Sequence, residues 1–204
     1  MTPPRSRQRN ARGEGGRLRL EISAAATRLI DNSDRLTLRA IAREAGIAGP
    51  SIYDHFPGVT EIRNEMIRSF YDDLVERIDE ANRGATDPVE RLQNTCLAYV
   101  GYGADFPRRY ALLFQVERDQ EEKAAVGARG AAALDTLVEA IAECKAAGRS
   151  SSDDPYRDAV AVWAALHGLT VLRASRPNFD LLHADSFMQT LVGRLASVGG
   201  RSKA

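Results

Sequence analysis

The sequence predicts an all-α protein, with a small N-terminal three-helix domain followed by a larger helical domain and about nine helices in all. Three observations favour this class. Apolar residues recur every three or four positions along most of the chain, which is the spacing of one helix face. No segment alternates apolar and polar residues for long enough to form a strand. Glycine and proline clusters interrupt the helical pattern where helices are expected to end.

The first sixteen residues are expected to form a disordered arm, because they contain prolines and glycines and no large apolar residue after Met1. Helical spacing begins at Leu18 and continues to Ile30, and Asn32 and Ser33 are expected to end this first helix. We therefore expect an arm over 1–16, a first domain over 17–68 and a helical domain over 69–204.

Two short helices follow, separated by a tight turn. Thr37 is a suitable N-cap for the first of them, since its hydroxyl can accept a hydrogen bond from a free backbone N–H. Gly46 lies where that helix should stop, in a left-handed conformation that glycine adopts without strain. The second short helix is expected over 49–55, with Pro50 in its first turn.

The rest of the chain predicts longer helices. An amphipathic helix is expected over 59–83, and the domain boundary is placed inside it. Further segments separated by proline, glycine or serine are expected near 88–105, 107–117, 120–147, 155–174 and 181–198.

The composition excludes several classes of protein. A chain of 204 residues with 44% hydrophobic and 27% charged residues is ordinary for a globular protein. No apolar run approaches the roughly 20 residues of a membrane span, and no signal peptide is recognisable. The two cysteines, Cys96 and Cys144, form no disulfide framework. We therefore expect a cytoplasmic protein with no membrane partner.

The charges are unevenly distributed, although the formal net charge is zero. Residues 1–60 hold ten arginines and six acidic residues, an excess of four positive charges. The remainder holds 18 basic and 22 acidic residues, an excess of four negative charges. A basic N-terminal region favours a polyanionic partner there, although chance scatter would also explain an excess of this size.

The segment Thr37–Gly58 has the layout of a helix-turn-helix, in which the second helix lies in the major groove of DNA. Ile52 and Phe56 would dock the short helix on its neighbours, while the small residues before it allow close approach to the bases. Neutral donors at its flank can contact phosphates. The predicted DNA-binding residues are Arg39, Ala48, Gly49, Pro50, Ser51, Tyr53 and His55, together with Arg9 and Arg12 of the arm.

This segment resembles the TetR family of bacterial transcriptional regulators. The family pattern is roughly I-A-x-x-A-G-V-S followed by L-Y-x-H-F, and it matches here at Ile41, Ala42, Ala45, Gly46, Ile47, Ile52, Tyr53, His55 and Phe56. The resemblance covers about residues 17–68. Two departures weaken the expected phosphate contacts: Ala48 replaces a capping serine, and Val59 replaces a lysine. The arginine-rich arm either compensates by entering the minor groove or is a solvated tail.

TetR-like proteins continue into a helical domain that binds a small molecule and dimerises. The stretches W-A-A-L-H-G-L (163–169) and P-R-R-Y-A-L-L-F (107–114) resemble a Trp/His-Gly subgroup of such domains. We expect an unknown effector to contact aromatic side chains and one histidine, with core packing as the alternative for each: Tyr99, Tyr102, Phe106, Phe114, Trp163 and His167. The helix over 155–174 is apolar on nearly every side, which predicts a homodimer interface formed by Leu166, Leu169, Leu172, Leu191 and Leu195.

The sequence therefore predicts a DNA-binding regulator, most simply a repressor that reads a palindromic operator as a homodimer and releases it on binding an effector. The alternative is a helical ligand-binding protein whose DNA binding is weakened or lost, as Ala48 and Val59 suggest. An enzyme is not expected, because no HExxH, GxSxG or paired-cysteine pattern is present. We expect no cofactor and no metal site.

Overall fold

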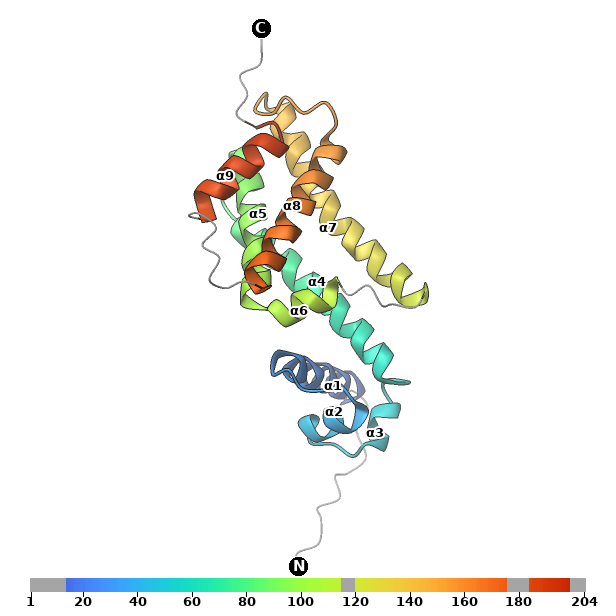
Figure 1. The fold of residues 1–204 in the computed structure, drawn as a ribbon. Helices are drawn as coiled ribbons and strands as arrows, with labels where there is room; N and C mark the ends of the chain where they lie inside the picture. The colour runs from blue at the N-terminus through green and yellow to red at the C-terminus, as the bar shows by residue number, and fades with distance from the viewer. Residues whose placement is uncertain (1–13, 115–119, 176–183, 199–204) are drawn as a thin grey trace, which may run out of the picture. The chain divides into compact units, whose positions relative to one another are not determined.

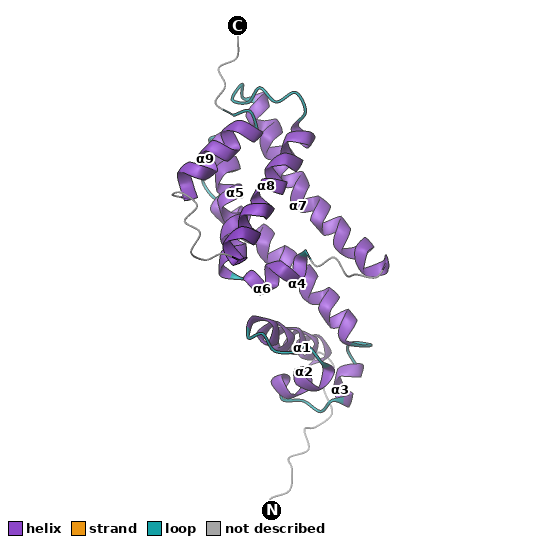
Figure 2. Cartoon of the chain, in the orientation of Figure 1, coloured by secondary structure: helices purple, strands orange, loops and turns teal. Residues whose placement is uncertain are grey.

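The computed structural model describes residues 14–114, 120–175 and 184–198, and in these ranges the chain is helical, as predicted. Figures 1 and 2 show helices joined by loops, and the one β-bridge is an isolated contact between Ser150 and Val198. The nine helices of the described residues are α1 (Glu14–Asp31), α2 (Leu38–Ala45), α3 (Pro50–Tyr53), α4 (Val59–Ala81), α5 (Pro88–Asp105), α6 (Pro107–Leu113), α7 (Gln120–Ala146), α8 (Pro155–Ser175) and α9 (Ala184–Leu195).

The helix ends differ from the predicted ones in several places. Helix α1 begins at Glu14, so residues 14–16, assigned to the arm, are helical. Helix α3 is a single turn, and α6 ends at Leu113 instead of residue 117. Helix α9 ends at Leu195, after which the chain turns through Ser197, whose φ is 53°. A left-handed residue interrupts the helical hydrogen bonds, which explains the early end.

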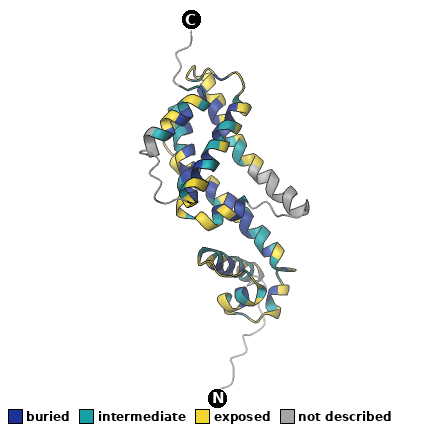
Figure 3. Cartoon of the chain, in the orientation of Figure 1, coloured by how far each residue is buried: buried dark blue, intermediate teal, exposed yellow. Residues whose placement is uncertain are grey.

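The chain divides into two compact units, Met1–Met66 and Ile67–Ala204, which part inside α4. The core of the first unit is built from one apolar side of each helix, and its fully buried members include Ile22, Leu29, Ile41, Ile52, Phe56 and Ile62. Figure 3 colours these buried residues dark blue, beside exposed residues in yellow on the same helices. One-sided burial of this kind is expected when short amphipathic helices pack around a common centre.

The second unit is a helical bundle in which α5 contacts α6, α7, α8 and α9. Gly103 of α5 sets one of the closest approaches. A Cβ atom at this position would lie 2.1 Å from Cγ2 of Thr170 in α8. Only the absence of a side chain lets the two helices lie this close, so this glycine is required for packing.

Candidate functional site

The turn between α2 and α3 has the geometry that the sequence predicts. Thr37 Oγ1 accepts a hydrogen bond from the backbone N–H of Ala40 at 3.1 Å. Gly46 has φ of 68°, and its N–H donates to carbonyls of the last turn of α2. The Ile47 N–H then donates to the Ala42 carbonyl at 3.0 Å. These hydrogen bonds stop α2 and redirect the chain into α3.

Helix α3 has one buried side and one exposed side. Ile52 and Phe56 are fully buried, whereas Tyr53 is 62% exposed. The small residues Ala48, Gly49 and Pro50 before and at the start of the helix are exposed, and Ser51 and His55 are partly buried. The N-cap of α3 is Gly49, and no side chain caps this end of the helix. The exposed side therefore presents a slim helix end flanked by a phenolic hydroxyl.

Arg19 of α1 connects three parts of the first unit, and sequence reasoning missed its role. Its guanidinium makes two hydrogen bonds to the Glu65 carboxylate of α4, at 2.6 and 3.0 Å. It donates a third to the His55 carbonyl at 2.6 Å and lies 4.1 Å from the centre of the Phe56 ring. The Glu65 hydrogen bond raises the pKa of Arg19. Arg19 thus holds the end of the helix-turn-helix in place.

Some of the positive charge expected to attract a polyanion is used inside the first unit. Arg19 pairs with Glu65, Arg28 pairs with Glu44 at 2.7 Å, and Arg17 pairs with Glu21 at 2.9 Å. Arg39 of α2 is exposed, while Arg9 and Arg12 lie outside the described residues. An arginine that is paired with a carboxylate attracts phosphate less than an exposed unpaired one. The positive electrostatic potential of this surface is therefore weaker than the number of arginines suggests.

In the second unit, four of the six predicted effector residues meet in one cluster with Tyr110. The Trp163 indole N–H donates to the Tyr99 hydroxyl at 3.2 Å, and this hydroxyl lies 2.9 Å from that of Tyr110. The Tyr110 hydroxyl lies 2.8 Å from Nδ1 of His167. The Phe114 ring lies 4.6 Å from the His167 ring. We name Trp163, Tyr99, Tyr110 and His167 the relay.

One arrangement of hydrogens gives each of these three hydrogen bonds one donor and one acceptor. In this arrangement Tyr99 accepts from Trp163 and donates to Tyr110, and Tyr110 donates to Nδ1 of His167. His167 is then neutral, with its proton on Nε2. Burial raises the pKa of Tyr110 to about 12 and lowers the pKa of His167, which agrees with a neutral relay.

The other two predicted effector residues, Tyr102 and Phe106, pair with each other, with ring centres 5.4 Å apart. The Arg109 guanidinium lies 4.4 Å from the centre of the Phe106 ring. Tyr102 is buried and Phe106 is half-buried. Their contacts are those of packed aromatic side chains stabilised by a cation–π interaction.

The predicted dimer residues are mostly buried within the chain itself, and the homodimer interface stays a prediction. Leu166 is fully buried, Leu169 and Leu191 are less than a tenth exposed, and Leu195 is partly buried. Of the five residues, Leu172 alone is well exposed, at 46%. Because α8 is apolar on nearly every side, its sequence does not reveal which side packs inward. The apolar residues on its outer side are Tyr156, Val160, Val171 and Leu172.

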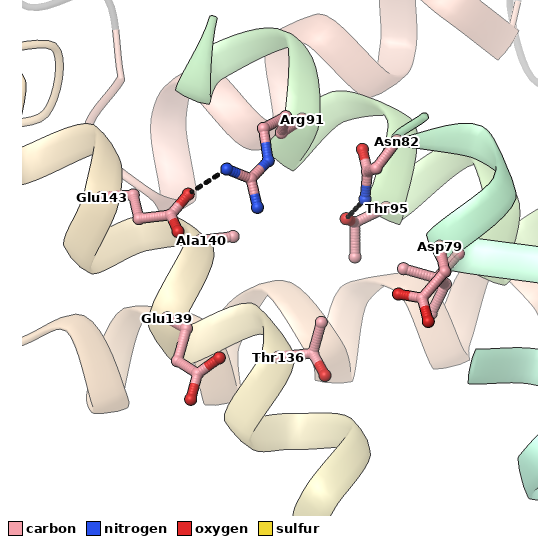
Figure 4. Close-up of a pocket in the computed structure, with 9 residues that line it drawn as sticks. Asp79, Asn82, Arg91, Thr95, Thr136, Glu139, Ala140 and Glu143 are labelled. Carbon is pink, nitrogen blue, oxygen red and sulfur yellow. Dashed lines mark hydrogen bonds and ion pairs between the residues drawn. The ribbon is translucent and has the colours of Figure 1, made fainter. Parts of the chain in front are cut away.

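A pocket that the sequence did not predict lies between α4, α5 and α7, with a volume of about 260 Å³ (Figure 4). Its wall is mainly polar and acidic: Ile78, Asp79, Asn82, Arg91, Thr95, Thr136, Glu139, Ala140 and Glu143. Arg91 pairs with Glu143 at 3.1 Å, and Asn82 donates to Thr95 at 2.9 Å. No pattern along the chain joins these residues, because they come from three separate helices.

The described part of the chain contains no cluster of three or more His, Cys, Asp or Glu side chains arranged to hold a metal ion. No helix among the described residues is both long and apolar enough to cross a membrane.

Comparison with known families gives two matches that together cover most of the chain. Residues 22–66 match the family described as bacterial regulatory proteins, tetR family. Residues 92–195 match the tetracyclin repressor-like C-terminal domain. The first match contains α2, α3 and the turn between them, and the second contains the relay. Neither description specifies the Trp/His-Gly subgroup, which stays a prediction.

One relative is similar in sequence over most of the chain, and two solved structures share its fold. The HTH-type transcriptional regulator Rv0681 of Mycobacterium tuberculosis is 30% identical over 169 residues, covering 80% of this chain and 72% of its own. A protein of unknown function from Rhodococcus sp. RHA1 has a TM-score of 0.77 at 23% identity, covering 88% of this chain and 94% of its own. FadR from Bacillus subtilis, solved in complex with stearoyl-CoA, has a TM-score of 0.71 at 17% identity, covering 87% and 97%.

Proposed function

Because this chain belongs to the TetR family of DNA-binding transcriptional regulators, we propose that it is a repressor that a small-molecule effector releases from its operator. The observation that supports DNA binding most directly is the exposed side of α3. Its slim, exposed start at Gly49 and Pro50 lies beside the 62% exposed Tyr53, on a helix whose other side is buried. An exposed short helix after a tight turn is the recognition helix of this fold class. We infer no catalytic activity.

The DNA contacts divide into two kinds in this proposal. Tyr53 and His55 donate to phosphates and position α3, whereas Gly49 and Ser51 lie against base edges and contribute to sequence preference. Arg39, Ala48 and Pro50 complete the surface, and Arg9 and Arg12 of the arm add charge. The hydrogen bond from Arg19 to the His55 carbonyl, at 2.6 Å, would keep this surface rigid in the DNA-free protein.

We propose that the effector binds in the second unit, against Phe114, Trp163 and His167. These side chains are partly exposed, unlike the buried Tyr99 and Tyr110 that support them. The neutral His167 would offer one N–H donor beside two aromatic rings, which suits an apolar ligand with an acceptor group. Residues of α4 belong to both units, so α4 is the element through which the effector would act on α3. A coupling free energy of about 1–3 kcal/mol is enough for a useful switch.

We propose further that the chain acts in the cytoplasm as a homodimer through the exposed side of α8. A dimer would place two copies of α3 about 34 Å apart, one helical turn of DNA, and would read a palindromic operator. The exposed apolar residues Val160, Val171 and Leu172 supply surface that a second subunit would cover.

Substitutions test the division of DNA contacts. We expect Tyr53→Phe and His55→Ala to weaken binding by a similar factor for every operator sequence, since phosphates carry no sequence information. We expect Gly49→Ala and Ser51→Ala to change the ranking of operator variants. A Cβ at Gly49 meets nothing within 4 Å, so that variant should fold normally. Binding is measured by fluorescence anisotropy on a panel of single-base operator variants. A uniform loss from all four substitutions would contradict the assignment.

A further inference from the structure

The pocket between α4, α5 and α7, which we name the α4–α5–α7 pocket, lies wholly within the second unit and shares no lining residue with the relay. Its volume of about 260 Å³ lies below the roughly 300–1,000 Å³ of sites for drug-sized ligands. The pocket therefore suits a small molecule with few heavy atoms.

The charges around this pocket favour a cation. Three carboxylates, those of Asp79, Glu139 and Glu143, face a single guanidinium, that of Arg91. Glu143 pairs with Arg91, so one carboxylate is neutralised within the wall. Figure 4 shows Glu139 and Thr136 of α7 across the open space from Asp79. The Asp79 and Glu139 side chains are exposed and have no hydrogen-bond or ion-pair partner among the described residues, so water solvates these two charges until a cation binds.

One hydrogen-bond acceptor of the pocket is buried and lacks a donor. Asn82 donates its amide N–H to Thr95, and its Oδ1 is buried without a partner among the described residues. The Thr136 hydroxyl donates to the Ala132 carbonyl and keeps lone pairs available. Burying an acceptor without a donor costs free energy, so a ligand that carries several N–H groups would be favoured.

The end of α4 supplies an independent argument for positive charge. The negative pole of the helix dipole lies at the C-terminus, where basic side chains are stabilising. The last turn of α4 instead contains Asp79 and Glu80 and no basic residue. A cation bound beside Asp79 would interact favourably with both the carboxylate and the helix end.

We propose that the α4–α5–α7 pocket binds a small organic cation of the aliphatic amine class. Its ammonium groups would pair with Asp79 and Glu139 and donate to neutral acceptors of the wall, while the methylene groups would lie on Ile78 and Ala140. This site is separate from the proposed effector contacts at Phe114, Trp163 and His167. The described residues contain no cluster of side chains arranged to hold a metal ion, which favours an organic cation at this pocket.

The test is isothermal titration calorimetry of the full chain with 1,4-diaminobutane, with 1,4-butanediol as the uncharged control. We expect one saturable site per chain for the diamine and none for the diol. Asp79→Asn and Glu139→Gln should each weaken diamine binding by roughly tenfold or more, because each removes a charge-assisted hydrogen bond. Both variants keep the shape of the side chain, and their folding is checked by circular dichroism.

Two control variants remove the same charge next to the pocket. Glu80→Gln lies beside Asp79 on α4, and Asp135→Asn lies one turn before Glu139 on α7, yet neither residue lines the pocket. We expect both to keep the dissociation constant within about twofold of the unmodified chain. Saturable diol binding, absence of diamine binding, or an equal loss in the control variants would overturn the proposal.

This measurement contains no DNA, so its outcome is independent of the proposed repressor function. Diamine binding can fail while operator binding persists, which would contradict only the pocket proposal. Operator binding can fail while diamine binding persists, which would contradict only the proposed function. His167→Gln should leave the diamine affinity unchanged, since the relay is a different site. A loss in that variant matching the loss in Asp79→Asn would contradict the separation of the two sites.

Discussion

At the scale of single residues, Arg19 makes three separate contacts in the first unit. It contacts Glu65 of α4 and, in the segment after α3, the His55 carbonyl and the Phe56 ring, and so ties α1 to α4 and to the end of the helix-turn-helix. We expect Arg19→Ala to lower the free energy of unfolding by about 1–3 kcal/mol, because a bidentate pair and a carbonyl hydrogen bond are lost together. Chemical denaturation measures this loss.

The matched control for Arg19 is Arg17→Ala. Arg17 is 79% exposed and pairs with Glu21 one turn along the same helix. Exposed pairs of this kind contribute roughly 0.3–0.5 kcal/mol. If both substitutions lowered the free energy of unfolding equally, the contacts of Arg19 with Glu65 and His55 would not stabilise the first unit more than an exposed ion pair does.

His167 gives a second prediction at this scale, concerning pH. Burial lowers its pKa below the ordinary 6.5, so protons bind the unfolded chain more readily than the folded one. The stability that depends on neutral His167 is therefore complete above pH 6.5 and is lost as the pH falls through the lowered folded-state pKa. We expect the melting temperature to fall more between pH 7.5 and 5 for the unmodified chain than for His167→Gln. Identical pH profiles would contradict a neutral relay.

At the scale of elements, the contact between α5 and α8 depends on Gly103. We expect Gly103→Ala to destabilise the chain by about 1–3 kcal/mol, because its Cβ would overlap Thr170 and force the helices apart. Gly16→Ala in α1 is the control, since a Cβ there meets nothing within 4 Å and alanine favours the helix. The two variants are compared by thermal unfolding, and a neutral Gly103→Ala would show that the bundle adjusts without cost.

The elements also show what could be predicted from the sequence. The caps at Thr37 and Gly46 were predictable because each depends on residues within one turn of the chain. The convergence of Trp163 and His167 was predictable because they lie four residues apart on one helix. Arg19 and Glu65 are 46 residues apart, and no local pattern connects them. The α4–α5–α7 pocket could not be predicted for the same reason, because its wall is built from residues of three helices that are far apart in the sequence.

Helix α8 shows a different limit. A helix that is apolar on nearly all sides has no polar stripe to mark its outer face. Leu166 and Leu169 were therefore predicted at the homodimer interface. In the structure they face inward, and Val171 and Leu172 face outward. The packing partners, which come from distant parts of the chain, decide the rotation of the helix about its axis.

At the scale of the whole molecule, the exposed side of α8 predicts self-association. We expect the unmodified chain to sediment as a dimer and Val171→Asp to sediment as a monomer, since a charge in an apolar interface is costly. Val75→Asp is the control, because Val75 is similarly exposed, at 38%, but lies on α4. Analytical ultracentrifugation separates the outcomes, and a dimer that survives Val171→Asp would place the interface elsewhere.

The central claim is that this chain reads DNA through α3, and a salt titration of operator binding tests it most directly. The unmodified protein is titrated onto its own upstream intergenic DNA and onto a scrambled fragment at several salt concentrations. We predict nanomolar binding that prefers the upstream fragment, with log K falling by roughly 0.9 per phosphate contact for each unit of log salt. Weak binding that is equal for both fragments at every salt concentration would contradict the claim and favour a helical ligand-binding protein whose Ala48 and Val59 mark a lost DNA site.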